Sequence, residues 1–147
     1  ASEKSVSSTA GHRLMEQLPY ADIRYSQARD HLIQLCRIME KEGDEMGFAA
    51  IVEAEALQLH ALMMSGPQPF ILMEPATLAI IRKVWSYRRE TGIPVCFTLD
   101  AGPNVHLLYP SRHQPAVMAW VQDELVGYCS EGRFIEDRVG SGPEKLA

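Results

Sequence analysis

The sequence predicts a single α+β domain, residues 1–147, in which helices pack on one face of a small antiparallel sheet. Its length is that of one domain, and 46% hydrophobic against 22% charged residues is enough for an ordinary core. Apolar residues recur at helical spacing in three segments between about residues 20 and 90. Two short segments rich in β-branched and aromatic residues follow on either side of a turn, which is typical of a β-hairpin.

Two helices are expected first, over residues 20–42 and from Asp44 to about residue 64. Pro19 precedes the first helix and Gly43 ends it, and Asp44 can cap the second, so the pair should form an antiparallel hairpin. The apolar pattern predicts buried faces made of Ile23, Ala28, Leu32, Leu35 and Met39 in the first helix, and of Phe48, Ile51, Val52, Leu59 and Leu62 in the second.

A third helix is expected from Pro75 to about residue 90, because proline is favoured in a first turn and Gly92 can end the last one. The spacing places Leu78, Ile81, Val84 and Trp85 inward, and Arg82, Lys83, Arg88 and Arg89 outward. Tyr87, Arg88 and Arg89 are interpreted as a solvated face of this helix.

The sheet is expected after the third helix. Residues 93–99 and 105–109 predict two strands, joined by the five-residue turn 100–104. A fourth helix is predicted over residues 115–128, where apolar residues recur every four positions. A last short strand is predicted over residues 133–139.

Charge and cysteine usage narrow the possible partners. Fourteen Lys and Arg against nineteen Asp and Glu give a net charge of -5, so we expect neither nucleic acid nor a membrane as a partner.

The three cysteines match no closed disulfide framework and no zinc spacing. We therefore expect a cytoplasmic protein without a metal site of its own, in which three free thiols are buried: Cys36, Cys96 and Cys129.

Asp100 is the most informative position for chemistry. It follows a predicted strand and opens a turn that Gly102 and Pro103 restrict, so its carboxylate would be rigidly supported at the edge of the sheet. That placement suits a catalytic base. The alternative is an Asx-turn, in which the carboxylate only accepts backbone N–H groups.

Two weaker candidates lie elsewhere. Ser7 and Ser8 precede a predicted short helix, where hydroxyl and N–H groups can bind a phosphate, although serine there also serves as an ordinary helix cap. His60, on the second helix, either faces a ligand or is a hydrogen-bonded histidine of the core or an interface.

Three motifs resemble those of the diphosphomevalonate decarboxylase family within the GHMP kinase superfamily. They are Val-Ser-Ser-Thr-Ala-Gly at residues 6–11, Phe-Thr-Leu-Asp-Ala-Gly-Pro-Asn-Val-His-Leu-Leu-Tyr at residues 97–109, and Val-Gly-Ser-Gly-Pro at residues 139–143. The helix around His60, residues 55–64, is similar as well. The resemblance covers the whole chain and implies a GHMP kinase C-terminal domain with a ferredoxin-like fold.

The resemblance implies an enzyme that converts mevalonate 5-diphosphate and ATP to isopentenyl diphosphate, CO₂, ADP and phosphate in isoprenoid biosynthesis. Asp100 would accept or orient the proton of the substrate's tertiary hydroxyl, and Ser8, and less surely Ser7, would contact its phosphate groups. ATP and Mg²⁺ would be bound mainly by an N-terminal half that this chain lacks, with residues 1–18 as the connection. The chain alone is therefore expected to be inactive, and it could form a homodimer.

Two other functions remain open from the sequence. The chain could belong to a GHMP small-molecule kinase, in which the same aspartate assists phosphorylation only. It could also be a non-catalytic ferredoxin-like module for ligand binding or dimerisation, because this architecture serves many functions.

Overall fold

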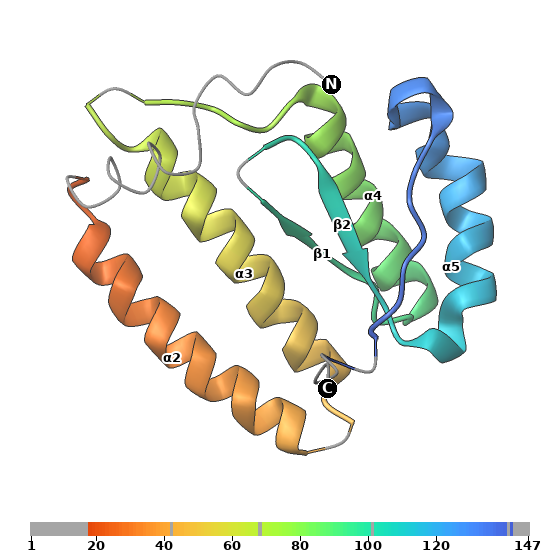
Figure 1. Cartoon of the computed structure of the whole chain (residues 1–147), viewed down its shortest axis with the longest axis horizontal. Helices are drawn as coiled ribbons and strands as arrows, with labels where there is room; N and C mark the ends of the chain where they lie inside the picture. Colours follow the sequence, from red (N-terminus) through yellow and green to blue (C-terminus); the bar gives the residue numbers. More distant parts are fainter. Residues whose placement is uncertain (1–17, 42, 68, 101, 141, 143–147) are drawn as a thin grey trace, which may run out of the picture.

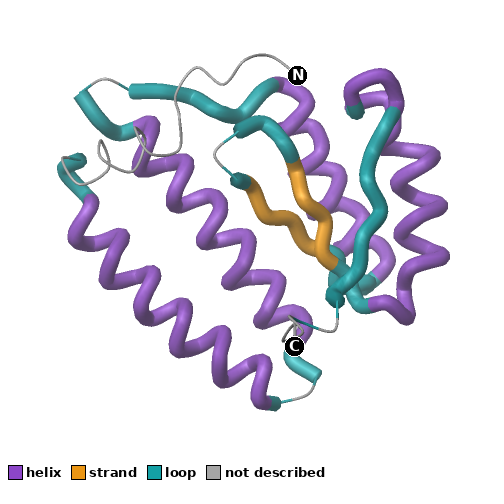
Figure 2. Tube along the Cα trace, viewed as in Figure 1, coloured by secondary structure: helices purple, strands orange, loops and turns teal. Residues whose placement is uncertain are grey.

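The computed structural model describes residues 18–41, 43–67, 69–100, 102–140 and 142. Three long helices precede a β-hairpin and a shorter C-terminal helix (Figure 1). The hairpin lies in the middle of the view, between the helices (Figure 2). The predicted α+β class is thus confirmed.

The first two helices form the predicted hairpin. α2 spans Ala21–Glu40 and α3 spans Glu45–Met64, and the two lie against each other. The Asp44 carboxylate accepts the Gly47 backbone N–H at 2.9 Å and so caps α3 as predicted. Gly43, in the connection, has a φ of 110°, a conformation that favours glycine.

The predicted buried face of α2 is only partly right. Three of its five residues are exposed by 60–72%, namely Ile23, Leu32 and Met39. The inward face instead carries Arg24 and His31, which both contact the Glu55 carboxylate of α3. Because α3 presents a carboxylate to α2, the contact between these helices is partly polar, which the spacing of apolar residues cannot reveal.

α3 is the central helix, with α2 on one side and the hairpin on the other. By length and composition it could cross a membrane, and it is alone in this among the helices that the structure describes. Its apolar character has another explanation, because a helix covered on two sides needs apolar residues on both. Its buried residues are Ala49, Ile51, Glu53, Ala56, His60, Leu62 and Met63.

α4 spans Pro75–Thr91 and has the predicted ends. Proline occupies its first turn, and Gly92 ends it in the left-handed conformation at a φ of 71°. Glu74 and Thr77 form a capping box, in which the Thr77 hydroxyl accepts the Glu74 backbone N–H at 3.2 Å. These local contacts set where the helix begins and ends.

The β-hairpin consists of β1, Cys96–Leu99, and β2, Val105–Leu108, and both strands are shorter than predicted. They are antiparallel, with Cys96 opposite Leu108 and Leu99 opposite Val105. β1 is largely buried against α3 and α4. The core around it comprises Ala56, Ile81, Val84, Val95, Phe97, Leu99, Val117, Val121 and Leu125.

The predicted fourth helix is confirmed but is not uniform. α5 spans Gln114–Trp120, and the chain continues through a wider turn, Val121–Leu125, and a tighter one, Val126–Tyr128. The predicted strand over residues 133–139 is wrong, because this segment is an exposed loop. β-branched and aromatic residues favour a strand only where they pack on a half-buried pleated surface, and Ile135 is 94% exposed.

The expectation of three buried thiols is also only partly right. All three cysteines are free, but only Cys96 is buried, whereas Cys129 is partly buried and Cys36 is exposed on α2. Burial raises the pKa of the Cys96 thiol to about 12. Cys96 is therefore a neutral thiol of the core.

Candidate functional site

Asp100 lies directly after β1, as the sequence predicts, and it is exposed. The Gly102 backbone N–H donates to the backbone carbonyl of Asp100 at 2.8 Å. An Asx-turn would require that same N–H to bond the Asp100 carboxylate. The geometry therefore disfavours the Asx-turn and leaves the carboxylate out of this contact.

Two helices hold the turn that carries Asp100. His60 of α3 donates from Nε2 to the Asp100 carbonyl oxygen at 3.2 Å. Thr77 of α4 donates from its hydroxyl to the Pro103 carbonyl oxygen at 2.7 Å. Both side chains are buried. Of the two roles that the sequence allows for His60, the structure shows that of a hydrogen-bonded histidine in the core.

Burial lowers the pKa of His60 below its usual value of 6.5, although the hydrogen bond to the Asp100 carbonyl and the charge of Asp100 partly oppose this. As the pH falls, His60 therefore takes up a proton at a higher pH in the unfolded chain than in the folded one. We expect this residue to lower the free energy of unfolding as the pH falls through 6.5, and to have no such effect well above it.

Urea unfolding at several pH values would measure this contribution. His60→Gln keeps an N–H donor but cannot titrate, so its free energy of unfolding should depend less on pH between about 5 and 7 than that of the wild type. Carboxylates that titrate nearby are common to both proteins and cancel in the difference. Identical pH slopes would contradict the prediction.

A buried ion pair lies at the start of β1. Arg88 Nη1 and Nη2 donate to the Glu53 carboxylate at 2.6 and 2.9 Å, and Trp85 Nε1 donates to it at 2.8 Å. Arg88 also donates to the Val95 carbonyl at 2.8 Å. The hydrogen bonds to Glu53 raise the pKa of Arg88. Together these contacts join α3, α4 and the residue just before β1.

This network corrects the expected solvated face of α4. Arg88 points inward and is 16% exposed, while Trp85, predicted inward, is 38% exposed. Tyr87 stacks on Trp120 with ring centroids 4.3 Å apart. The spacing of apolar residues does not predict that Arg88 is buried, because its partner, Glu53, is 35 positions away in the sequence.

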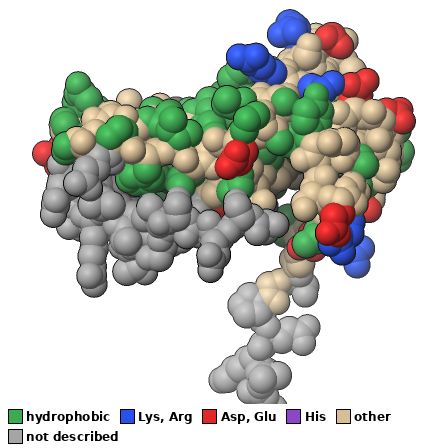
Figure 3. Space-filling model, turned by 90° about the horizontal axis from the view of Figure 1, so that it is seen from above, with side chains coloured by type: hydrophobic (Ala, Val, Ile, Leu, Met, Phe, Trp, Pro, Cys, Tyr) green, Lys and Arg blue, Asp and Glu red, His purple; other side chains and the backbone are tan. Residues whose placement is uncertain are grey.

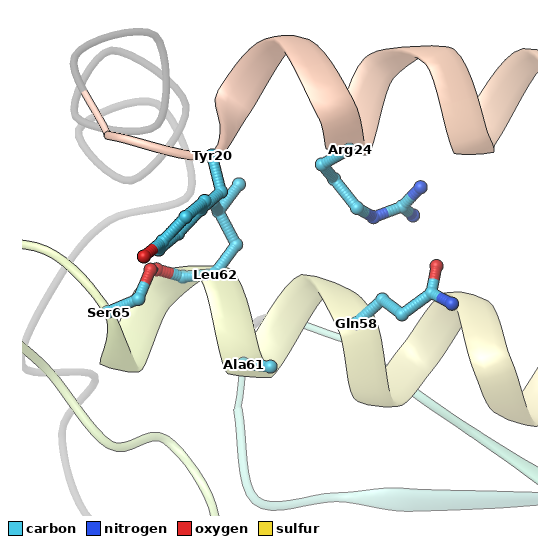
Figure 4. A pocket seen from close by; sticks show the side chains of 6 residues that line it. All are labelled: Tyr20, Arg24, Gln58, Ala61, Leu62 and Ser65. Carbon is cyan, nitrogen blue, oxygen red and sulfur yellow. The ribbon is translucent and has the colours of Figure 1, made fainter.

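A cavity of about 260 Å³ lies between α2 and α3 (Figure 4). It is lined by Tyr20, Arg24, Gln58, Ala61, Leu62 and Ser65. Arg24 and Gln58 extend toward each other from the two helices in this view. None of the described residues of the turn, 100 and 102–104, lines this cavity, so it is separate from the candidate site at Asp100.

Apolar side chains remain exposed on several elements, among them Ile71 at 71% and Leu78 at 48%. Figure 3 shows many hydrophobic side chains over the left and middle of one face, whereas most of the charged ones lie toward its top and right. Contiguous apolar surface is typical of a contact with another domain or partner. No group of three or more His, Cys, Asp or Glu side chains that could hold a metal occurs within the described residues.

The other predicted site residues, Ser7 and Ser8, lie outside the described residues. The structure adds two residues to the surroundings of Asp100 that sequence reasoning did not connect with it. The sequence predicts His60 as a residue that faces a ligand or is hydrogen-bonded in the core or an interface, and it predicts no role for Thr77 at this turn. The Glu-Pro-x-Thr pattern signals the helix cap, but nothing in it shows that the hydroxyl also reaches Pro103.

Known proteins similar to this chain agree on one family. Residues 1–145 match the profile described as mevalonate 5-diphosphate decarboxylase C-terminal domain. The diphosphomevalonate decarboxylase of Schizosaccharomyces pombe is 27% identical and covers 99% of this chain, with 44% of its own length matched. The phosphomevalonate decarboxylase of Haloferax volcanii is 30% identical over 82 residues, which are 56% of this chain and 25% of that protein.

Solved structures agree with these relatives. A mevalonate diphosphate decarboxylase from Legionella pneumophila has a TM-score of 0.80 at 31% identity, over 87% of this chain and 40% of that one. A protein designated MDDEF, in complex with MVAPP, AMPPCP and magnesium, has a TM-score of 0.77 at 25% identity. The match covers 86% of this chain and 38% of the MDDEF chain. The chain thus spans less than half the length of the relatives it matches.

Proposed function

The chain belongs to the family of mevalonate 5-diphosphate decarboxylase C-terminal domains, and we propose that it supplies one wall of the active site of such an enzyme. The complete protein would convert mevalonate 5-diphosphate and ATP to isopentenyl diphosphate, CO₂, ADP and phosphate in the cytoplasm. An N-terminal half would supply the other wall, with residues 1–18 as the connection. The names of the relatives and their greater length support this assignment.

The position of Asp100 carries the proposal. Its carboxylate stands on a turn at the end of β1, and the Gly102 N–H and the His60 Nε2 bond the backbone carbonyl. An exposed carboxylate on a rigid support can accept a proton from a bound substrate.

Asp100 would act on the tertiary hydroxyl of the substrate. It would accept or orient the hydroxyl proton while that oxygen takes the γ-phosphoryl group of ATP. Loss of the new phosphate group leaves the tertiary carbon short of electrons. The bond between the carboxylate carbon and the neighbouring methylene carbon then breaks, its electron pair forms the double bond to the tertiary carbon, and CO₂ is released. Ser8, and less surely Ser7, would contact the phosphate groups of the substrate.

ATP and Mg²⁺ would be bound mainly outside this chain. The MDDEF structure holds AMPPCP and magnesium, and its chain is more than twice as long as the matched part. In this chain Asp100 is not part of a cluster of metal-binding side chains within the described residues. The role proposed for Asp100 uses its carboxylate alone.

Turnover by the complete protein tests the proposal. With ATP and Mg²⁺, mevalonate 5-diphosphate should yield isopentenyl diphosphate and CO₂. Accumulation of a 3-phosphorylated acid would instead identify a kinase, and turnover of mevalonate 5-phosphate alone would identify the activity named for the Haloferax volcanii relative. No turnover of either substrate would support the non-catalytic module.

This chain by itself should release no CO₂ and bind ATP weakly, because it presents only one wall of the site. Isothermal calorimetry with ATP and a CO₂-release assay on the purified chain would measure both. The complete protein under the same conditions is the positive control. Release of CO₂ by the isolated chain would show that the proposed N-terminal half is not needed.

A further inference from the structure

The turn that carries Asp100 is tied to the rest of the molecule by two buried side chains from different helices. His60 is 2% exposed and Thr77 is 1% exposed. They donate to the carbonyl oxygens of Asp100 and Pro103, 3.2 and 2.7 Å away. The two contacts lie at the two ends of the turn and come from α3 and α4.

Each of the two donors can form its hydrogen bond in only one arrangement, which holds the turn in one position. A neutral imidazole that donates from Nε2 carries its proton there and leaves Nδ1 bare, so the contact defines one tautomer. The Thr77 hydroxyl accepts the Glu74 N–H and donates to Pro103, which also leaves it a single orientation. A buried donor of either kind would be left unpaired if the turn moved away.

We infer that His60 and Thr77 are positioning residues, which hold the Asp100 carboxylate in its reactive place through the backbone carbonyls of Asp100 and Pro103. This inference rests on the proposed function, since it takes Asp100 as the group that meets the substrate. Neither side chain needs to touch the substrate. Displacing a reacting group by 1 Å can cost on the order of 100-fold in rate, so such supports matter to turnover.

Matched variants of the complete protein test the inference. Thr77→Val keeps the shape of the side chain but removes the hydroxyl, whereas Thr77→Ser keeps the hydroxyl. His60→Leu removes the donor, whereas His60→Gln keeps an N–H group at a similar reach. Thr77→Val and His60→Leu should lower kcat by about 10- to 100-fold with KM little changed. Thr77→Ser and His60→Gln should restore most of the loss.

Glu74→Ala is the control for helix capping. It removes the Glu74 side chain from the capping box but leaves the contact between Thr77 and Pro103. It should reduce thermal stability without the fall in kcat seen in Thr77→Val. If Glu74→Ala and Thr77→Val lower kcat equally, the Thr77 effect is one of helix stability and its positioning role is wrong.

Nuclear magnetic resonance on this chain gives a readout that does not depend on turnover. Long-range ¹H–¹⁵N spectra should show His60 as the Nε2–H tautomer at neutral pH. The amide signals of Gly102 and Asn104 should shift in Thr77→Val and His60→Leu and return toward the wild type in the two conservative variants. An Nδ1–H tautomer, or unshifted signals in both disruptive variants, would overturn the inference.

The two readouts separate this inference from the proposed function. A wild-type protein without turnover contradicts the proposed function, while the spectra still show whether the turn is held. An active wild type whose disruptive variants keep full kcat contradicts only the positioning role of His60 and Thr77.

Discussion

Asp100→Asn in the complete protein should lower kcat by about two to four orders of magnitude, the contribution typical of a general base. The substitution replaces the carboxylate with an amide that cannot accept the hydroxyl proton. It leaves the backbone carbonyl that bonds His60 and Gly102 unchanged. Stability and substrate affinity should therefore stay near those of the wild type. Steady-state kinetics with product analysis and thermal unfolding would measure these effects.

Asp123→Asn is the matched control. Asp123 is an exposed carboxylate in the turn that follows α5, and it has no place in the proposed site. Its neutralisation changes the net charge as Asp100→Asn does and should leave turnover unchanged. Near-normal kcat in Asp100→Asn would remove this residue from the mechanism, whatever the activity of the complete protein.

Glu53→Ala should lower the free energy of unfolding of this chain by about 3–5 kcal/mol, the cost typical of breaking a buried ion pair. The Glu53 side chain is 8% exposed, and that of Arg88 is 16% exposed. Without the carboxylate, the Arg88 guanidinium and the Trp85 N–H lose their buried acceptor. Glu53→Gln should cost less, because the amide oxygen still accepts one hydrogen bond. Urea unfolding would measure both losses.

Glu55→Ala provides the comparison within the same helix. Glu55 is two residues further along α3 and contacts Arg24 and His31, but its side chain is 34% exposed. The Glu55 carboxylate is screened by water, but Arg24 is only 11% exposed and would lose its acceptor, so the loss should be smaller than in Glu53→Ala without being negligible. Equal losses in Glu53→Ala and Glu55→Ala would show that burial of the Glu53–Arg88 pair is not what makes it important.

The central part of the candidate site was predictable from local sequence. Asp100 follows a strand pattern and precedes Gly102 and Pro103, and the surrounding residues match a family motif. The anchors of the turn were not predictable to the same degree. His60 and Thr77 lie 40 and 26 positions away from the carbonyls they bond, and no spacing rule connects groups that meet only through the fold.

Local sequence predicted the three long helices and their ends, because helix caps and turns depend on neighbouring residues. Asp44, Pro75 and Gly92 act where they stand in the chain, and their helices begin or end as predicted. Tertiary structure alone decided which side chains are buried and which extended segment becomes a strand. Arg88 turns inward because Glu53 is there to neutralise it, and the segment 133–139 remains a loop although its composition favours a strand. Burial and strand pairing depend on partners distant in the sequence, and only folding brings those together.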